Sequence, residues 1–425
     1  MTIEELIKPG LESIQTRADE IDALLSEMEE IPDEIANTIK NTVQSEAYRE
    51  WHKWNNSWGL IAAATGVGKS RIALIAASWI VEQKPNARIL ICVPTERLRD
   101  KNWEEEFRKW KMIRVYNKNV TRVCHVSMSK IEKETYDMVI FDEAHNITEM
   151  NSTFFKKNTI HTAMCLTATP SSDPLKKLLL TECGFKTVYS LSLDIAVKLR
   201  LVSPYEITII ETRLESSKKT VPGGSKEKPF LNTELNQYNY LTNTVNKLMF
   251  NKSKTPKEQA VVQFRVIARM HFIYNLQSKM EAAENVIRNL PKDERTLIFC
   301  SNIAQAEKLC SDTYHSQTDD TALKSFMKGD INTLSCVQSL NEGHNIPVKV
   351  DNAVVVQINS SDRTLVQRIG RVLRYKKGHV AKIILIVCVE TVDENWLFKA
   401  IAGLDESKIT RVRYKNLELL TTNPI

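Results

Sequence analysis

Short apolar runs alternate with stretches of helical periodicity along most of the chain. In the first half, these runs lie at Leu60–Ala63, Ile89–Val93, Met138–Phe141 and Ala163–Leu166. In the second half, they lie at Thr296–Cys300, Thr333–Val337, Ala353–Ile358 and Ile383–Val389. Strands that alternate with helices are typical of a parallel sheet covered by helices on both faces. The pattern therefore predicts two α/β domains in tandem.

Two regions depart from this alternation. Roughly the first forty residues carry apolar positions at helical spacing with Asp and Glu between them, and Pro9, Gly10 and Pro32 divide them into short helices. Further along, a polar stretch precedes long helical sequence from Glu234 to Leu290. We therefore expect an acidic helical segment at 1–41, one α/β domain at 42–204, and a second at 205–425 with a helical insertion at 213–290.

Composition and charge narrow the class of protein. A chain of 425 residues exceeds what one hydrophobic core usually organises. No apolar run reaches the roughly 18 residues that a membrane-spanning helix needs, so we expect no membrane role. The N-terminus does not resemble a secretory signal and the eight cysteines include no Cys-x-x-Cys pair, so we expect a reducing, cytoplasmic location. A net charge of +6 is compatible with a polyanionic partner but does not establish one.

A phosphate-binding loop is predicted at residues 63–70, which read Ala-Ala-Thr-Gly-Val-Gly-Lys-Ser between an apolar strand and a helical stretch. Ala63 replaces the first glycine of the strict pattern. The backbone from Thr65 to Gly68 can curl around phosphates at the positive end of the following helix. Lys69 is expected to contact the β- and γ-phosphates, and the Ser70 hydroxyl is expected to bind Mg²⁺. The loop thus predicts ATP and Mg²⁺ as cofactors, with Thr65, Gly66, Val67, Gly68, Lys69 and Ser70 as their ligands.

Two adjacent carboxylates follow the apolar strand that ends at Phe141. Asp142 can hold the water shell of Mg²⁺, and Glu143 can accept a proton from the water that attacks the γ-phosphate. An acidic turn after a core strand is the structural alternative. The upstream phosphate-binding loop favours catalysis.

The sequence Asp142-Glu143-Ala144-His145 resembles the DEAH box of superfamily 2 helicases, and further segments resemble that family's motifs in the family's order. They are Gln44 for the Q motif that reads adenine, Val93–Leu98 for motif Ia, Thr167–Pro170 for motif III, Leu297–Ser301 for motif IV, Leu340–Pro347 for motif V and Gln367–Arg374 for motif VI. The resemblance spans roughly residues 42 to 390. It implies two RecA-like domains and an ATPase that depends on nucleic acid.

The resemblance also assigns residue roles. Arg371 and Arg374 lie three residues apart, on one helical face, so both guanidinium groups can reach a γ-phosphate and supply an arginine finger, which contributes roughly 10³–10⁵ in rate. A solvated basic helix is the alternative. By this resemblance, the nucleotide site includes the catalytic residue Gln367 and the cofactor-binding residues Gly343 and Asn345. The residues that couple the nucleotide site to the nucleic acid are His145, Thr167 and Thr169. Nucleic-acid contacts are expected from Thr95, Arg97, Ser127, Ser301 and Gln338. For Ser127 and Ser301, a role as loop caps is the alternative.

The Gln-Arg-Ile-Gly-Arg-Val-Leu-Arg form of motif VI resembles the branch of XPB, phage UvsW and the restriction translocases more than the DEAD-box RNA helicases. We therefore expect a DNA helicase or translocase, of phage type and acting in the host cytoplasm. It is expected to make sequence-tolerant backbone contacts to DNA, branched DNA included. The DNA-reading domain that precedes the UvsW motor is not recognisable in residues 1–41. The alternatives are a DEAH-type RNA helicase, the motor subunit of a restriction system and a non-catalytic nucleic-acid scaffold. The presence of Lys69, Glu143 and Arg371 argues against a non-catalytic scaffold.

Two segments lie outside these motifs. Lys218, Lys219, Lys226 and Lys228 form a basic loop, which we interpret as a solvated linker, with contact to duplex DNA as the alternative. The acidic N-terminal helices are interpreted as a solvated cap beside the first domain, with masking of a basic cleft or partner docking as the alternatives.

Overall fold

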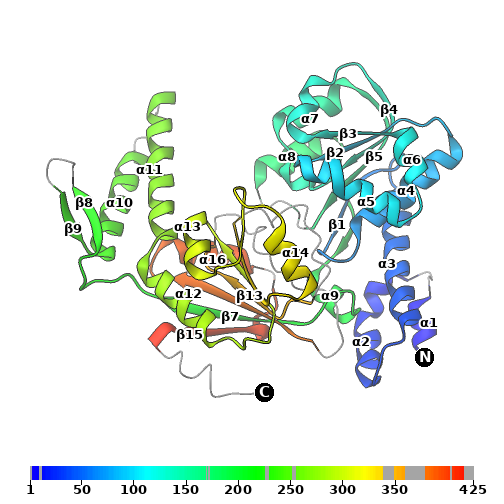
Figure 1. The fold of residues 1–425 in the computed structure, drawn as a ribbon. Coiled ribbons are helices and arrows are strands. Elements are labelled where there is room, and N and C mark those ends of the chain that lie inside the picture. Colours follow the sequence, from blue (N-terminus) through cyan, green and yellow to red (C-terminus); the bar gives the residue numbers. More distant parts are fainter. Residues whose placement is uncertain are drawn as a thin grey trace. The chain divides into compact units, whose positions relative to one another are not determined.

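The computed structural model describes residues 2–8, 12–168, 170, 173–224, 229–250, 255–337, 349–358, 379–402 and 404–415. The described chain forms two compact units. The first comprises the residues up to Pro204 together with Lys349, His379 and Val380, and the second comprises the other described residues from Tyr205 onward. Each unit is a parallel β-sheet flanked by helices (Figure 1). The predicted fold class, two tandem RecA-like domains, is thereby confirmed. None of the described helices combines the length and hydrophobicity that crossing a bilayer requires.

The sheet of the first unit has six parallel strands in the order β3-β2-β4-β5-β1-β6. They are β1 Trp58–Ala63, β2 Ile89–Val93, β3 Val120–Cys124, β4 Thr135–Phe141, β5 Thr159–Thr167 and β6 Thr187–Leu191. The four predicted strands correspond to β1, β2, β4 and β5. The sequence pattern does not predict β3 and β6, because these edge strands are partly exposed and carry polar residues among the apolar ones.

The helices of the first unit pack on this sheet or on one another. They are α1 Ile3–Ile7, α2 Ala18–Glu27, α3 Asp33–Lys53, α4 Lys69–Gln83, α5 Trp103–Lys109, α6 Ile113–Asn119, α7 Glu149–Lys157, α8 Pro174–Glu182 and α9 Leu193–Lys198. Shorter helical turns are η1 Ile14–Arg17, η2 Leu98–Asn102, η3 His125–Lys130 and η4 Ala144–Asn146. One face of the sheet buries Phe154 and Phe155 of α7 and Leu179 of α8. Helices α3 and α4 pack on the central strands, and Trp51 Nε1 of α3 donates to the Ala163 carbonyl at 2.9 Å.

The N-terminal helices pack against the rest of the first unit. Glu46 of α3 is buried, and its carboxylate accepts hydrogen bonds from Ser13 Oγ at 2.9 Å and from the Ile14 N–H at 3.0 Å. Arg200, after α9, donates to Ser26 Oγ at 2.8 Å and pairs with Asp22 at 2.6 Å. Buried apolar residues and these polar contacts therefore attach α1 and α2 to the first domain.

The sheet of the second unit has seven parallel strands in the order β11-β12-β10-β13-β14-β7-β15. They are β7 Tyr205–Thr212, β10 Thr296–Cys300, β11 Thr313–Tyr314, β12 Thr333–Val337, β13 Asn352–Val355, β14 Ala381–Cys388 and β15 Ile409–Arg413. The four strands predicted in this half correspond to β10, β12, β13 and β14, although β13 ends three residues before the predicted Ile358. Its helices outside the insertion are α13 Ile303–Leu309, α14 Thr321–Lys328, α16 Val392–Ile401 and the turn η5 Glu406–Lys408.

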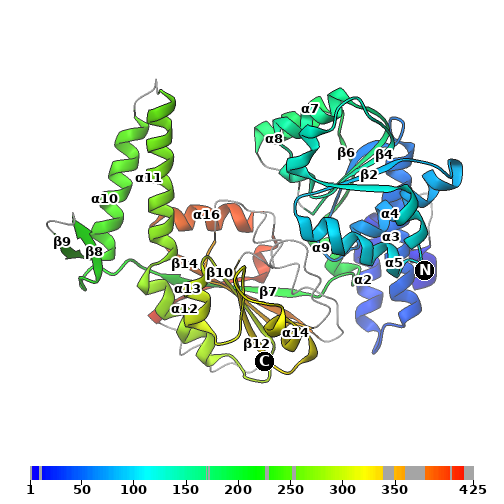
Figure 2. The same cartoon turned by 45° about the horizontal axis from the view of Figure 1, so that its top comes forward.

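The insertion after β7 contains a hairpin and three helices, β8 Val221–Gly224, β9 Pro229–Asn232, α10 Glu234–Met249, α11 Pro256–Tyr274 and α12 Gln277–Asn289. Sequence analysis predicts an irregular polar loop where the hairpin lies. The ring of Phe230 covers Gly223 on the paired strand, where an added Cβ would lie 3.0 Å from the ring, and this pairing stabilises strands that the composition disfavours. Helices α10 and α11 extend side by side away from the sheet in Figures 1 and 2.

Helix α12 belongs to the core of the second unit. Met280, Ala283 and Val286 pack with the sheet residues of the main cluster. Lys279 and Asp393, both fully buried, form an ion pair of 2.6 Å that joins α12 to α16, and Gln357 Oε1 accepts from Lys279 Nζ at 3.1 Å. Removing one partner of such a pair leaves an uncompensated buried charge, so this contact fixes the base of the insertion on the sheet.

Candidate active site

The carboxyl ends of the parallel strands in the first unit meet at one edge of the sheet. The segment after β1 is the phosphate-binding loop, Thr95 follows β2, Asp142 follows β4, and Thr167 ends β5. Since β1, β5, β4 and β2 are consecutive neighbours, these segments share that edge. Ligand sites of open α/β sheets form at this position.

The phosphate-binding loop has the backbone conformation that its glycines allow. Gly66 and Gly68 have φ values of +96° and +92°, in the left-handed region that favours glycine. Gly68 caps α4, so the N–H groups of the first helical turn point toward this end of the helix. A Cβ on Gly68 would lie 2.5 Å from Gln44 Nε2. The loop therefore presents the donors and the positive helix end that bind phosphate.

Gln44 supports this loop from α3. Its side chain is 2% exposed, and Nε2 donates to the Val67 carbonyl at 2.9 Å. The structure thus brings the predicted Q-motif residue against the predicted phosphate-binding loop. Contact of Gln44 with adenine stays a prediction.

Lys69 and Ser70 open α4 at the mouth of the loop. Lys69 Nζ donates to the Ala63 carbonyl at 3.0 Å, across the loop, and Ser70 is half-buried. The Thr65 hydroxyl is buried and has no hydrogen-bond partner within the described part of the chain. An unsatisfied buried hydroxyl and a lysine at this position provide groups that a phosphate ligand can engage.

Asp142 is fixed by two donors. The Glu143 N–H donates to Oδ1 at 3.0 Å, and Trp103 Nε1 donates to Oδ2 at 3.3 Å. Burial and the neighbouring Glu143 carboxylate raise the pKa of Asp142 to about 7, whereas Lys69 acts in the opposite direction. A carboxyl whose charge is disfavoured in this way gains from a nearby cation.

Ser70 and Asp142 supply the oxygen ligands that Mg²⁺ prefers. Within the described residues, no group of three or more His, Cys, Asp or Glu side chains could hold a metal alone. The chemistry of these two side chains therefore fits an ion that is also bound by nucleotide phosphates and water.

Glu143, His145 and Thr167 form a chain of contacts behind Asp142. Glu143 has a φ of +50°, and its Oε2 lies 3.4 Å from His145 Nδ1. His145 Nδ1 lies 3.0 Å from Thr167 Oγ1, and both of these residues are buried. The structure thus joins two of the predicted coupling residues to the predicted base. Lys176 Nζ also donates to the His145 carbonyl at 3.0 Å.

Two residues near Asp142 are not predicted from the sequence. Trp103 donates to Asp142, and His125 stacks on Phe141 with ring centroids 4.3 Å apart. Burial lowers the pKa of His125 to about 4, so this ring is neutral at ordinary pH. Neither residue belongs to a sequence motif. From the sequence alone, Trp103 is interpreted as an apolar position on a helix.

The predicted nucleic-acid contacts lie at strand ends. Thr95 Oγ1 accepts from the Leu98 N–H at 3.4 Å, while Arg97 and Ser127 are half-buried in or beside the turns that follow β2 and β3. Ser301 Oγ donates to Gln305 Oε1 at 2.8 Å, which is the contact expected of a loop cap. Binding of nucleic acid by these residues stays a prediction.

Several predicted residues lie outside the part of the chain that the structure describes. They are Thr169, Gln338, Gly343, Asn345, Gln367, Arg371 and Arg374. Their roles stay predictions.

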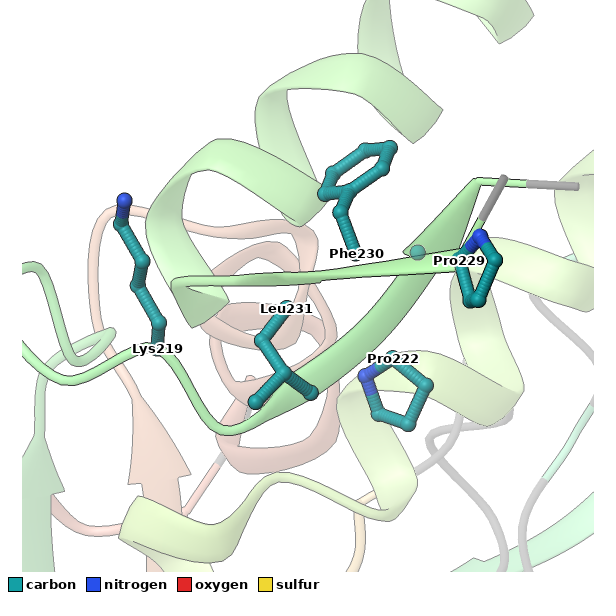
Figure 3. A pocket seen from close by; sticks show the side chains of 6 residues that line it. Lys219, Pro222, Pro229, Phe230 and Leu231 are labelled. Carbon is teal, nitrogen blue, oxygen red and sulfur yellow. The ribbon is translucent and has the colours of Figure 1, made fainter.

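One surface hollow lies in the insertion of the second unit. It has a volume of about 520 Å³, is lined by Lys219, Pro222, Gly223, Pro229, Phe230 and Leu231, and lies on the β8–β9 hairpin of the second unit (Figure 3). The phosphate-binding loop belongs to the first unit.

Comparison with known proteins agrees with two consecutive motor domains. Residues 37–172 match the family model of the type III restriction enzyme res subunit, and residues 278–376 match that of the helicase conserved C-terminal domain. No curated protein matches the chain in sequence.

Two solved structures share the fold at low sequence identity. Dbp5 of Saccharomyces cerevisiae, bound to RNA and ADP BeF3, is 14% identical with a TM-score of 0.55, over 93% of this chain and 97% of that one. The type ISP restriction-modification enzyme LlaBIII, bound to DNA, is also 14% identical with a TM-score of 0.54, over 87% of this chain. The match spans 31% of LlaBIII. With both family models in their order along two RecA-like units, the chain carries the motor domains of a superfamily 2 helicase, a family that uses ATP.

Proposed function

We propose that this chain is an ATP-dependent DNA helicase or translocase that unwinds or remodels DNA, including branched DNA. The observation that carries the proposal is the meeting of three features at one sheet edge. These are the loop that begins α4 at Lys69, the Asp142 and Glu143 carboxylates, and the contact of His145 with Thr167.

The described residues suggest how the nucleotide site acts. Backbone N–H groups at Gly68 and the Lys69 ammonium bind the phosphates, and Glu143 takes a proton from the attacking water. Bound Mg²⁺ supplies charge neutralisation on the phosphate oxygens, with Ser70 and Asp142 as its protein ligands. Arg371 and Arg374 complete the site in this proposal.

The contact between Thr167 and His145 suggests how nucleic acid influences hydrolysis. Thr167 ends β5, while His145 lies beside the proposed base Glu143. A change at the end of β5 can therefore reach the base through the buried His145 ring, which contacts both Thr167 and Glu143. This supports a turnover rate that responds to bound nucleic acid.

DNA is favoured over RNA by two sequence observations. The first domain matches the family model of the type III restriction enzyme res subunit, and motif VI resembles that of the XPB and UvsW branch. The same match favours a second candidate function, the motor subunit of a restriction system. That function requires a nuclease or methyltransferase partner.

The proposal is tested by ATP hydrolysis of the full chain with single-stranded DNA, duplex, fork, four-way junction and RNA. We expect DNA to stimulate turnover and RNA to have a smaller effect, while Glu143→Gln loses turnover with every substrate but retains nucleotide binding. Stimulation by RNA alone contradicts the proposal and indicates an RNA helicase. Turnover that appears only with an added nuclease or methyltransferase subunit indicates the restriction motor.

A further inference from the structure

Helix α11 exposes an apolar face. Val261, Phe264 and Ile267 are 45%, 65% and 46% exposed, and Lys257 and His271 are also exposed. Helical spacing places these residues on one side, with Phe264 at its centre. We call this set, together with Arg265 at its border, the α11 face. A large aromatic side chain exposed to this extent at the middle of a projecting helix indicates a binding surface.

The insertion that presents this face holds the positive charge of the chain. Residues 213–274 contain eleven Lys or Arg and four Asp or Glu, a net charge of +7, whereas the whole chain has +6. One of the four acids, Glu234, is buried and accepts from the N–H groups of Glu215 and Ser278. The net charge of the insertion sequence is therefore complementary to a polyanion.

Cationic and exposed aromatic side chains occur together in two parts of the insertion. The Arg265 guanidinium lies 5.8 Å from the centroid of the Phe264 ring. On the β8–β9 hairpin, Phe230 is 55% exposed and lines the open hollow together with Lys219 (Figure 3). Aromatic rings with neighbouring cations are the combination by which proteins bind unpaired bases and their phosphates.

We propose that the α11 face binds single-stranded nucleic acid, with a base stacked on Phe264 and phosphates held by Arg265 and its basic neighbours. The inference rests on the proposed function, which supplies the nucleic acid, and adds a binding surface outside the helicase motifs. Charge favours this occupant over a protein, because lysine is depleted at protein interfaces whereas the insertion is rich in it.

Binding of a labelled oligothymidylate to the full chain, measured by fluorescence anisotropy without ATP, tests the proposal. We expect Phe264→Ala to weaken binding roughly 5- to 100-fold, as the loss of one stacked base predicts. Phe264→Trp should keep the affinity and Phe264→Leu should lose it, because stacking needs an aromatic ring. Arg265→Ala should lower the salt dependence of binding by about 0.7 in slope.

Phe398→Ala is the matched control. Phe398 is 52% exposed on α16 of the same unit, and the Arg411 guanidinium lies 5.6 Å from its ring. We expect this variant to bind as the wild type does. An equal loss in both variants means that any exposed phenylalanine matters and overturns the assignment to α11.

Other outcomes overturn the proposal separately from the proposed function. Full affinity in Phe264→Ala, or in Phe264→Leu, contradicts stacking on α11. A wild-type dimer that Phe264→Ala converts to a monomer, with unchanged oligonucleotide binding, identifies a protein surface instead. If the wild type binds no nucleic acid at all, the proposed function itself fails. Basal ATP hydrolysis, measured in each variant, should not change because Phe264 is exposed in the second unit.

Discussion

Gly68 and Gln44 constrain one another at the start of α4. The positive φ of Gly68 excludes ordinary side chains, and its Cα faces the amide that holds Val67. Gly68→Ala should destabilise the fold by about 1–2 kcal/mol from backbone strain alone and weaken ATP binding at least tenfold. Chemical denaturation and calorimetric titration with a non-hydrolysable ATP analogue measure the two effects.

The double variant separates the two causes. Removing the Gln44 side chain in Gly68→Ala/Gln44→Ala relieves the contact of 2.5 Å but leaves the strained φ. We expect the double variant to lose less stability than the sum of the losses in the two single variants. If the single variant Gly68→Ala keeps the stability and the ATP affinity of the wild type, the loop does not require glycine at position 68 and this prediction is wrong.

His125 makes stability depend on pH. The pKa of this buried ring is lowered from 6.5 to about 4, so the unfolded chain binds a proton in that interval while the folded chain does not. Stability is therefore present above pH 6.5 and decreases as the pH falls toward 4, by up to about 3 kcal/mol. Denaturation of His125→Gln over this range should show a correspondingly smaller loss. His161→Gln, which changes an exposed histidine, should keep the wild-type profile; equal profiles for all three proteins refute the prediction.

At the residue scale, the sequence indicates candidate site residues but not the contacts that these residues make. Lys69 and Asp142 follow from loop and strand patterns, since these motifs are local in sequence. The contact of Gln44 with Val67 and that of Trp103 with Asp142 join residues 23 and 39 positions apart. Only folding brings such pairs together, so no spacing rule indicates them.

Among the elements, the N-terminal helices depend on one buried acid. Glu46→Ala leaves the Ile14 N–H and the Ser13 hydroxyl without their acceptor, which costs about 1–3 kcal/mol. Because these hydrogen bonds attach the segment before α2 to α3, we expect the loss as local opening, seen as faster amide exchange at residues 12–27. Glu50→Ala on the same helix removes an exposed pair with Lys53 and should leave that exchange unchanged. Unchanged exchange in Glu46→Ala contradicts the prediction.

Elements are predictable where burial is uniform along them. Strands β1, β2 and β10 are buried along nearly their whole length and read as nearly continuous apolar runs. The β8–β9 hairpin is the opposite case. Residues 229–231 of β9 are exposed, and the pairing of Phe230 with Gly223 compensates for weak strand propensity. Pairing across strands is not visible in a single segment.

For the whole molecule, the order of the motifs along the sequence is enough to predict two motor domains. The sheets and the two family models agree with that prediction. The arginine finger at Arg371 and Arg374 rests on the resemblance alone, since these residues lie outside the described chain. Preference for DNA likewise stays a proposal.

Steady-state ATP hydrolysis by the wild type and by Lys69→Ala, each with and without single-stranded DNA, tests the central claim most directly. We predict that DNA stimulates the wild type and that Lys69→Ala reduces turnover by about 10²–10³-fold, because a donor to the transferred phosphoryl group is lost. The circular dichroism spectrum should not change, since Lys69 Nζ donates within its own loop, to the Ala63 carbonyl. Hydrolysis by Lys69→Ala at the wild-type rate would contradict the assignment of the nucleotide site and with it the motor.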